Sequence, residues 1–477
     1  MEKYENETIA AIATALSDSG IGIVRISGEN AIYIVDSIFR SPSGNRILTK
    51  VQSHTIHYGY IVDKEENVID EVMTAVMKAP KSYTMEDTVE INCHGGVLVM
   101  QKVLQAVLQS GARMAEPGEF TKRAFLNGRI DLSRAEAVID VIHSQNEYAL
   151  SSSVSQLKGR LSEQIRSLRE KILYQIAFIE SALDDPEHIS LDGYPEQLSE
   201  KLTSYEHEIE KLLATADNGR LMKEGISTVI VGKPNAGKSS LLNMLLGEDR
   251  AIVTEIAGTT RDALHETINL HGISLNMIDT AGIHETQDVV EKIGVERAKK
   301  YACDADLILY VVDASGALDE DDRNIISLLE GKKAIILLNK SDLENRITEE
   351  SLKNIMSQVL DNTEDICIIR TSTISTIDHF PEKSGMEELE DTIRNMFFDG
   401  KLKHNNELII TNLRHKEALQ DALNSLQLVE RSIEDGMPED FYSIDLTSAY
   451  ASLGKIIGEE VDEDVVNEIF SKFCMGK

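Results

Sequence analysis

The sequence predicts a multidomain protein with an α+β N-terminal domain, an all-α helical domain and an α/β domain inserted within the helical one. Three observations support this prediction. Short β-branched runs alternate with turns over residues 1–125, which is typical of an α+β domain. Apolar residues recur every three or four positions over 126–221 and again over 399–477, whereas strand-like runs and turns occupy 222–398. We therefore expect one helical domain in two segments around an inserted domain.

Four segments of the N-terminal domain have a clear local pattern. "GIGIVRISG", "HTIHYGYIV" and "TVEINCHGG" are rich in β-branched and aromatic residues and predict strands. "GGVLVMQKVLQAVLQSGA" has the apolar spacing of a helix.

The helical domain is predicted to begin at "DLSRAEAVIDVIHSQ", where Ser133 and Glu136 have the spacing of a capping box. Apolar residues then recur at helical spacing from Leu150 to Leu183, which predicts one rod of roughly 50 Å. Further helical patterns cover 196–219 and the segment after residue 400. We interpret these apolar stripes as core packing and not as a cofactor site.

The overall charge limits the choice of partners. The net charge is -33, with 27% charged residues. A protein that holds nucleic acid broadly through phosphate contacts needs a positive face, so any role with nucleic acid is expected to be local or shared with a partner.

Cysteine use and the first residues predict a cytoplasmic protein without membrane association. The four cysteines do not form pairs with metal-ligand spacing and are too sparse for a disulfide scaffold. "MEKYENETIA" lacks the basic start and apolar run of a signal peptide. No stretch reaches the ~18 to 20 uncharged apolar residues that span a bilayer.

The inserted domain opens with a phosphate-loop motif. "GKPNAGKSS", Gly232 to Ser240, matches G-x-x-x-x-G-K-[ST] and lies between the strand-like "STVIV" and the helical "SLLNMLLG". Its glycines allow the backbone N–H groups to surround phosphate oxygens, and Lys238 is expected to reach the outer phosphates. Ser239 is expected to bind Mg²⁺.

Three further motifs follow in the order of a guanine-nucleotide-binding domain. "GTTRD" supplies Thr260 as a switch residue for magnesium, and "DTAG", Asp279 to Gly282, supplies a carboxylate near magnesium and a glycine N–H at the γ-phosphate. "NKSD" supplies Asp342, which can accept the N1–H and 2-amino hydrogens of guanine. "TSTIS", with Ser372 and Thr373, departs from the usual Ser-Ala-Lys. We therefore expect a Ras-like α/β P-loop G domain that binds GTP.

The sequence indicates the catalytic groups for GTP hydrolysis less clearly than the groups that bind the nucleotide. Ile283 occupies the position of the water-orienting glutamine of Ras, so another group must hold the attacking water. The acidic residues that follow are all chemically suitable: Glu285, Asp288, Glu291 and Glu296. The loop has no arginine to act as a finger, but the amide oxygen of Asn235 is able to coordinate a monovalent cation in its place. A hydrogen bond that braces the loop is an equally good reading of Asn235.

These motifs resemble the MnmE (TrmE) family of tRNA-modification GTPases over nearly the whole chain. The matching segments include "GIVRISG", "VEINCHGG", "PGEFTKRAFLNGRIDLSRAEAVIDVI", "IAGTTRD", "IGVERA" and the final "FCMGK". The resemblance implies an N-terminal domain that forms a homodimer and binds 5-formyltetrahydrofolate, and a G domain activated by K⁺-dependent dimerisation. It also implies a heterotetramer with the flavoprotein MnmG (GidA), which adds a carboxymethylaminomethyl or aminomethyl group to C5 of the wobble uridine of certain tRNAs.

The resemblance assigns roles to individual residues of this chain. The water-orienting carboxylate falls on Glu291. The K⁺ ligands fall on Asn235, Thr254, Ile256 and Thr259, and the Mg²⁺ ligands on Ser239 and Thr260. The folate contacts fall on Arg25, Glu90, Arg129 and Lys477.

The motifs and the resemblance together give the expected GTP contacts. These are Asn235, Ala236, Gly237, Lys238, Ser239, Ser240, Thr254, Glu255, Ile256, Ala257, Gly258, Thr259, Thr260, Asp279, Thr280, Ala281, Gly282, Asn339, Lys340, Asp342, Ser372 and Thr373.

Two of these assignments have competing readings. Arg25 and Glu90 can form an ion pair with each other, which is the reading that the sequence alone favours. Cys474 lies four places from the end, but the following Gly476 and Lys477 fit a prenylation signal poorly. A buried, inert thiol competes with the reading from the resemblance, in which the tail lies beside the folate and Cys474 takes part in its site.

Two other functional classes compete with the modification GTPase. A ribosome-assembly or signalling GTPase would share the G domain, but such proteins usually carry a basic RNA-binding module, and none is visible in the sequence. A folate-dependent transferase with a vestigial G domain would not need Glu291.

Overall fold

A computed structural model describes residues 7–247, 266–270, 272–278, 301–372, 385–398, 408–474 and 476 of the chain. The chain divides into two compact units. The first comprises Met1–Ile142, Ser155–Tyr205 and Ala418–Lys477, and the second comprises His143–Val154 and Glu206–Glu417. Each unit is described separately below.

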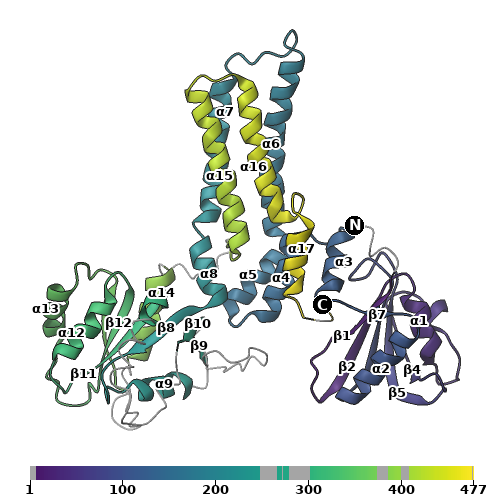
Figure 1. Cartoon of the computed structure of the whole chain (residues 1–477), viewed down its shortest axis with the longest axis horizontal. Coiled ribbons are helices and arrows are strands. Elements are labelled where there is room, and N and C mark those ends of the chain that lie inside the picture. The colour runs from purple at the N-terminus through teal and green to yellow at the C-terminus, as the bar shows by residue number, and fades with distance from the viewer. Residues whose placement is uncertain are drawn as a thin grey trace. The chain divides into compact units, whose positions relative to one another are not determined.

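The N-terminal part of the first unit is a seven-stranded sheet of order β3-β4-β5-β6-β2-β1-β7 (Figure 1). Its strands are β1 (Ile9–Ile12), β2 (Ser19–Ser27), β3 (Phe39–Arg40), β4 (Thr55–Val62), β5 (Val68–Met77), β6 (Thr88–Gly95) and β7 (Arg113–Met114). Neighbouring strands are antiparallel except β1 and β7, which are parallel. The three predicted strand segments correspond to β2, β4 and β6.

One face of this sheet packs against α1 (Ala31–Ile38) and α2 (Val97–Gln109), the second of which is the predicted helix. Alternate residues of β2 point to opposite faces, so Val24 and Ile26 are buried in the core with the helices. Arg25 therefore points to the other face, where it lies directly across from Glu90 of β6.

The helices outside the two sheets form the helical part, and the residues of α5, α7 and α15 are divided between the two units. The helices are α3 (Glu119–Leu126), α4 (Leu132–His143), α5 (Glu147–Leu157), α6 (Arg160–Asp184), α7 (Tyr194–Leu213), α15 (Leu413–Glu434), α16 (Glu439–Ile457) and α17 (Glu463–Ser471). Helix α6 packs along α16, and residues such as Leu168 and Leu453 are fully buried. Among the described residues, no helix is long and apolar enough to cross a membrane.

The prediction of one continuous helix from Leu150 to Leu183 is wrong. Helix α5 ends at Leu157, and α6 begins at Arg160. Gly159 between them has φ 90°, a left-handed conformation that breaks the α-helical path and that glycine adopts without strain.

The predicted capping box at Ser133 and Glu136 is also wrong. Helix α4 starts two residues earlier than that pattern requires, and the carboxylate of Asp131 accepts the N–H of Arg134 at 3.1 Å. Ser133 lies inside the first turn, fully buried, with its hydroxyl 3.0 Å from that of Ser162. The cap therefore belongs to Asp131.

The second unit contains a six-stranded sheet of order β13-β12-β11-β8-β10-β9 (Figure 1). Its strands are β8 (Ile226–Val231), β9 (Glu266–Leu270), β10 (Ile273–Met277), β11 (Leu307–Asp313), β12 (Lys333–Asn339) and β13 (Ile366–Arg370). All neighbours are parallel except β9 and β10, which form an antiparallel hairpin.

Helices cover both faces of this sheet, which explains why its central strands are apolar throughout. The helices among the described residues are α8 (Ala216–Glu224), α9 (Lys238–Gly247), α12 (Glu320–Ile326), α13 (Glu349–Val359) and α14 (Met386–Phe398). Leu309 of β11 packs in a core with α9 and α14, whereas its neighbour Tyr310 packs in a second core with α12 and α13. In a sheet of this kind, ligands bind at the carboxyl ends of the strands.

Candidate nucleotide-binding site

The loop after β8 has the backbone shape of a phosphate-binding loop. Gly232 and Gly237 have φ values of 154° and 103°, and Asn235 is left-handed with φ 62°. A Cβ on Gly232 would lie 2.4 Å from the carbonyl oxygen of Val311, so a side chain would collide with β11. The loop leads directly into α9, and the predicted strand–loop–helix context is present.

Lys238 brings a positive charge into this loop. Its ammonium donates to the carbonyl oxygens of Gly232 and Lys233, both at 2.8 Å. Burial lowers the pKa of Lys238. The charge lies at the N-terminus of α9, where unpaired N–H groups and the helix dipole favour an anion.

Asn339, at the end of β12, connects a second motif to the loop. Its Nδ2 donates to the carbonyl oxygen of Ala236 at 2.9 Å. The residue is 1% exposed, and among the described residues its Oδ1 has no hydrogen-bond partner. A buried acceptor without a partner is costly, so a ligand that donates a hydrogen bond would fit here.

The rest of the guanine motif lies at the same end of the sheet. Lys340 donates to the Asp313 carboxylate at 2.5 Å, at the end of β11. Burial raises the pKa of Asp313 and the bonds from Lys340 and Ser315 lower it, with a net lowering. The hydroxyl of Ser372 donates to Asp342 at 2.7 Å, so these two predicted residues are in contact.

The structure also shows a network that the sequence did not indicate. Lys233, inside the phosphate loop, bonds to Asp322 at 2.7 Å and to Asp319 at 2.9 Å, both in the first turn region of α12. Asp322 is 1% exposed and also accepts from the hydroxyl of Tyr310 at 2.7 Å. Burial lowers the pKa of Lys233, but the two aspartates raise it more. Lys233 is thus committed to α12 and not to a phosphate.

Ser239 and Ser240 are exposed in the first turn of α9, which is where a magnesium ligand and a phosphate contact are expected. The other predicted contacts lie outside the described residues. These are Thr254, Glu255, Ile256, Ala257, Gly258, Thr259, Thr260, Asp279, Thr280, Ala281, Gly282, Glu291, Thr373 and Lys477, together with Glu285, Asp288 and Glu296.

In the first unit, the predicted folate residues Arg25 and Glu90 form an ion pair across β2 and β6. Arg25 Nε lies 2.8 Å from Glu90 Oε1, and the two side chains are 17% and 23% exposed. Arg25 also donates to the carbonyl oxygen of Gly476 at 3.0 Å. The competing reading of the sequence, a mutual pair, is therefore present in the structure, and the pair lies against the C-terminal tail.

Tyr83 links the third predicted folate residue to this pair. The guanidinium carbon of Arg129 lies 4.8 Å from the centre of the Tyr83 ring, and that of Arg25 lies 5.9 Å from it. Arg129 also donates to the Tyr83 carbonyl oxygen at 2.9 Å. Both residues line a pocket of about 530 Å³ with His54, Met77, Pro80, Lys81, Ser82 and Met85. Tyr83 was not predicted from the sequence as a site residue.

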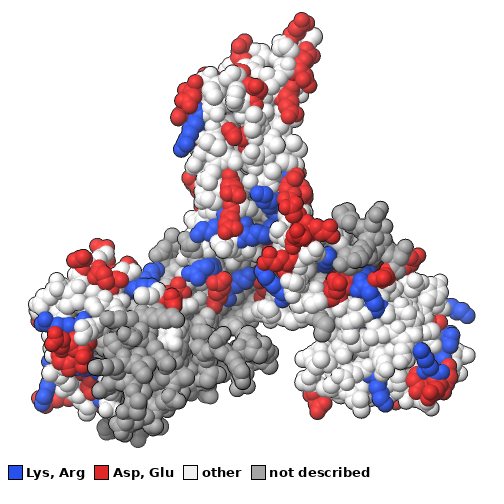
Figure 2. Space-filling model, in the orientation of Figure 1, with Lys and Arg blue, Asp and Glu red and all other residues white. Residues whose placement is uncertain are grey.

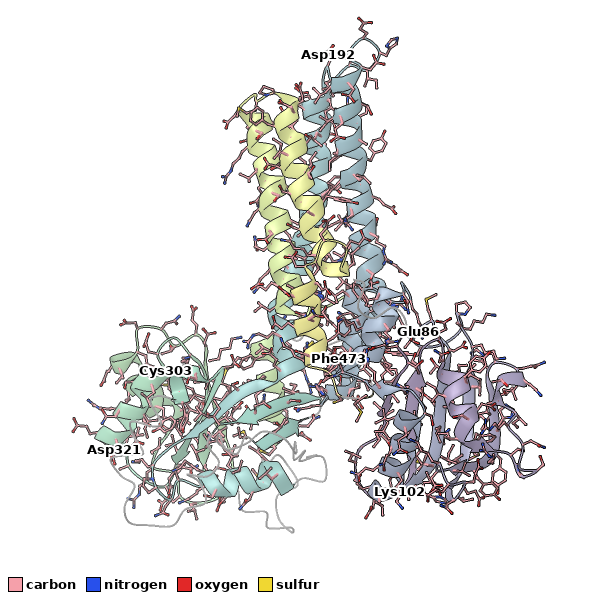
Figure 3. All side chains as sticks on the ribbon, turned by 45° about the vertical axis from the view of Figure 1, so that its right-hand side comes forward. Glu86, Lys102, Asp192, Cys303, Asp321 and Phe473 are labelled. Atoms are coloured by element: carbon pink, nitrogen blue, oxygen red, sulfur yellow. The ribbon has the colours of Figure 1, made fainter. Side chains whose placement is uncertain are left out.

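The C-terminal tail is held by packing. Phe473, labelled in Figure 3, is buried, and its ring lies 5.3 Å from that of Phe470. Gly476 is also buried, and a Cβ on it would lie 2.5 Å from the carbonyl oxygen of Ile12. Cys474 between them is exposed, so the interpretation of Cys474 as a buried, inert thiol is wrong.

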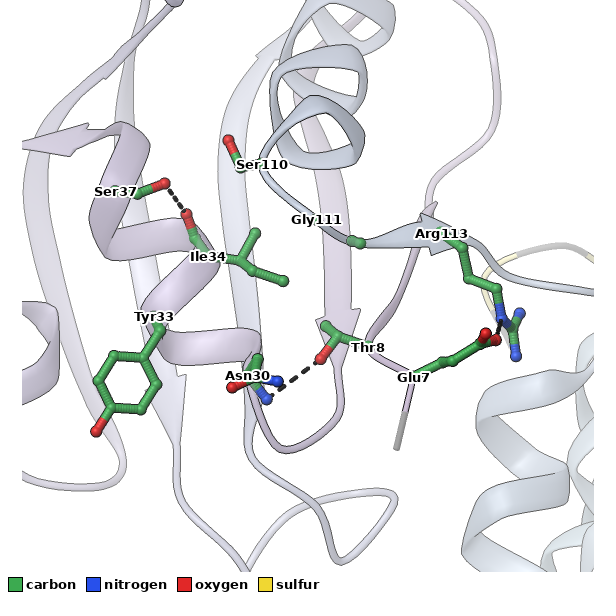
Figure 4. A pocket seen from close by; sticks show the side chains of 10 residues that line it. Glu7, Thr8, Asn30, Tyr33, Ile34, Ser37, Ser110, Gly111 and Arg113 are labelled. Atoms are coloured by element: carbon green, nitrogen blue, oxygen red, sulfur yellow. Dashed lines mark hydrogen bonds and ion pairs between the residues drawn. The ribbon is translucent and has the colours of Figure 1, made fainter. Parts of the chain in front are cut away.

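A second hollow of the N-terminal part contains none of the predicted residues (Figure 4). It has a volume of about 470 Å³ beside α1 and β7. Arg113 on its rim pairs with Glu7 at 2.5 Å and with Glu119 at 2.6 Å. Its charge is thus compensated by two carboxylates, and we assign no ligand to this hollow.

The fold and the converging motifs of the second unit define a P-loop nucleotide-binding protein. Comparison with known sequences identifies the family. Residues 8–129 match the description "GTP-binding protein TrmE N-terminus", and residues 132–474 match "MnmE helical domain". The chain belongs to the MnmE family.

Curated relatives match over the full length. The "tRNA modification GTPase MnmE" of Lachnoclostridium phytofermentans is 56% identical, with 99% of this chain and 100% of that protein covered. The proteins of the same name from Alkaliphilus oremlandii and Bacillus subtilis are 48% and 45% identical, again over 99% of this chain and 100% of theirs.

Proposed function

We propose that the chain is a K⁺-dependent GTPase that acts with the flavoprotein MnmG in modifying the wobble uridine of certain tRNAs. The reaction would add a carboxymethylaminomethyl or aminomethyl group at C5, with a one-carbon unit from 5-formyltetrahydrofolate. The observation that carries this proposal is the full-length match to proteins named tRNA modification GTPases, in a chain whose phosphate loop and Asn339 are joined at the strand ends.

The residues of the phosphate loop and of the motifs that follow it suit the binding of GTP and its ions. The N–H groups of the loop and the ammonium of Lys238 would hold the phosphates, and Asp342 would accept from guanine. Ser239 and Thr260 would hold Mg²⁺, which supplies positive charge to the β- and γ-phosphates. Asn235, Thr254, Ile256 and Thr259 would hold K⁺, which supplies charge where other GTPases use an arginine.

The hydrolytic step needs an oriented water. Glu291 would hold it in line with the γ-phosphorus, so that the new P–O bond forms as the bond to the β–γ bridging oxygen breaks. GDP and inorganic phosphate are the products.

The N-terminal part would bind the folate and form the homodimer. Glu90 is suited to the amino-pyrimidinone edge of the pterin, and Arg25, Arg129 and Lys477 to the carboxylates of the glutamate tail of the folate. The domain limits 1–125, 126–221 with 399–477, and 222–398 remain our prediction for this organisation. A cytoplasmic heterotetramer with MnmG is the expected assembly.

The distribution of charge supports the proposal that this chain and its flavoprotein partner bind tRNA together. On the face shown in Figure 2, acidic side chains gather at the far end of α6 and α7, where Asp184, Asp185, Glu187 and Asp192 are exposed. Such a surface repels phosphates, so the flavoprotein would supply most of the tRNA contacts.

The test is a nucleoside analysis of wobble uridine in tRNA from cells that lack this gene. We expect the C5 modification to disappear, to return with the wild-type gene, and not to return with Lys238→Ala. Unchanged modification in the deletion strain would refute the proposal. It would favour the alternative of a ribosome-assembly or signalling GTPase.

A further inference from the structure

The β9–β10 hairpin occupies a special place in the sequence of the second unit. The motif "GTTRD" precedes β9, and "DTAG" follows β10. Both motifs change their contacts with the γ-phosphate in GTPases of this class. The hairpin is regular, with Leu275 opposite Ile268, and β10 pairs with β8, which leads to the phosphate loop. It therefore connects, through paired strands, two segments that are expected to respond to the nucleotide.

Asn146, in the connection between α4 and α5, joins this hairpin to two other segments. Its Nδ2 donates to Ser274 Oγ of β10 and to the carbonyl oxygen of Met222 of α8, both at 3.0 Å. Its Oδ1 accepts the N–H of Ala149 at 2.8 Å, which caps the start of α5. The side chain is 7% exposed, and Ser274 is 3% exposed.

The turn of the hairpin is held by the same connection. Asn269 Nδ2 donates to the carbonyl oxygen of Gln145 at 2.9 Å, and Asn269 Oδ1 accepts the N–H of Gly272 at the same distance. A Cβ on Gly272 would lie 2.8 Å from the ring of Tyr148, so ring and turn are in close contact. Both ends of the contact lie in the second unit.

This arrangement makes the start of α5 sensitive to the position of the hairpin. A buried amide with three bonds has well-defined geometry, and a shift of β10 by even 1 Å would lengthen the bond to Ser274 beyond hydrogen-bonding range. The same amide caps α5, so a change at β10 would change the order of the first turn of α5. Coupling of this kind requires contacts that differ between two states, and the bond between Asn146 and Ser274 is the contact that we expect to differ.

We propose that Asn146 is a positioning residue through which the nucleotide state of the G domain is transmitted to helix α5. The proposal rests on the proposed function, since it requires binding of GTP and GDP. Coupling between two sites is reciprocal. If GTP and GDP stabilise the Asn146 contact to different extents, removing the contact must change the ratio of the GTP and GDP affinities by the same factor.

The test uses the full-length chain and measures the dissociation constants of GDP and of a non-hydrolysable GTP analogue. We expect Asn146→Ser, which keeps a capping oxygen, and Ser274→Ala to change the ratio of the two constants by about fivefold or more. In the wild type, amide exchange at Ala149 and Leu150 is expected to differ by about fivefold between the two nucleotides. The difference should vanish in both variants.

Asn324→Ser, an exposed asparagine of α12 in the same unit, is the matched control and should leave the ratio unchanged. If Asn146→Ser fails to fold, Ser274→Ala alone decides. A lower melting temperature with an unchanged ratio would show a static brace and overturn the inference, while leaving the proposed function intact. Failure of the wild type to bind either nucleotide would overturn both.

Discussion

Asn339 donates to the carbonyl oxygen of Ala236 across 2.9 Å, so the end of β12 holds the phosphate loop in place. Replacing Asn339 with alanine removes this bond and leaves the Ala236 carbonyl without its partner, which costs about 1 to 3 kcal/mol. We expect Asn339→Ala to weaken GTP binding by about tenfold in titration calorimetry. Asn354→Ala, on the exposed face of α13, is the control. Equal affinities for the two variants would contradict this assignment.

Asp322 gives a second test, because it is buried between Lys233 of the loop and Tyr310 of β11. Removing one partner of a buried ion pair typically costs about 3 to 5 kcal/mol. We expect Asp322→Ala to lower the free energy of unfolding of the second unit by that amount in urea, and to weaken GTP binding. Asp321, labelled in Figure 3, is its exposed neighbour, and Asp321→Ala should cost less than about 0.5 kcal/mol. Similar losses for both would show that Asp322 acts only as a first-turn charge.

Glu119 makes the stability of the first unit depend on pH. It is 2% exposed; burial raises its pKa, but bonds from Arg113, the N–H of Glu116 and Arg123 lower it more. The folded-state pKa thus lies below the unfolded value of about 4.3, so the carboxylate stabilises the fold above that pH. This stabilisation is lost as the pH falls through the folded-state pKa.

The measurement compares Glu119→Gln with the wild type in urea at pH 7 and pH 3. The variant should be less stable by about 3 to 5 kcal/mol at pH 7, because Arg113 and Arg123 lose a buried partner. The gap should narrow at pH 3, because the carboxyl of the unfolded wild type is protonated there and the stabilisation by the ionised form is reduced. Glu170→Gln, exposed on α6, should show no gap at either pH. A gap that is constant with pH would mean that packing, not charge, accounts for the effect.

The parts of the site that the sequence predicted are those encoded in contiguous residues. Two local features place the phosphate loop at Gly232, the lysine at its end and the residues after β12. These are the positive φ angles of the loop glycines and the strands that precede each motif, so the positions could be predicted from the motifs. Helix and strand types followed in the same way from apolar spacing.

The contacts that the sequence did not predict join residues distant along the chain. Lys233 and Asp322 are 89 positions apart, and Asn146 and Ser274 are 128 apart. Lysine, aspartate and asparagine are common surface residues, so nothing in their spacing identifies a buried partner. Gly159 did carry a signal, since glycine often ends a helix, but the apolar pattern continues across it and concealed the break.

Glu90 tests the folate proposal, because its pairing with Arg25 is a sufficient structural reason for both residues. Glu90→Gln keeps the shape and one acceptor but removes the charge. We expect binding of 5-formyltetrahydrofolate to weaken about tenfold or more, since charge-assisted bonds contribute about 1.5 to 3 kcal/mol. Glu66→Gln, which breaks an exposed pair with Arg40, should leave folate binding unchanged. If Glu90→Gln binds folate as well as the wild type, the ion pair is structural.

Asn235 decides whether potassium takes part in hydrolysis. The residue is exposed and left-handed in the loop, and its side chain makes no hydrogen bond to the residues that the structure describes. The alternative of a loop-bracing bond therefore has no partner in that part of the chain, which leaves the amide oxygen available to a cation.

We expect wild-type GTP hydrolysis to be about tenfold or more faster in KCl than in NaCl, because a positive charge near the β–γ bridge stabilises the transition state. Asn235→Ala should reduce the rate in KCl to that in NaCl, whereas Asn354→Ala should keep the difference. Equal wild-type rates in the two salts, or a potassium effect that survives in Asn235→Ala, would rule out this role. Asn235 would then contribute only its left-handed backbone conformation to the loop.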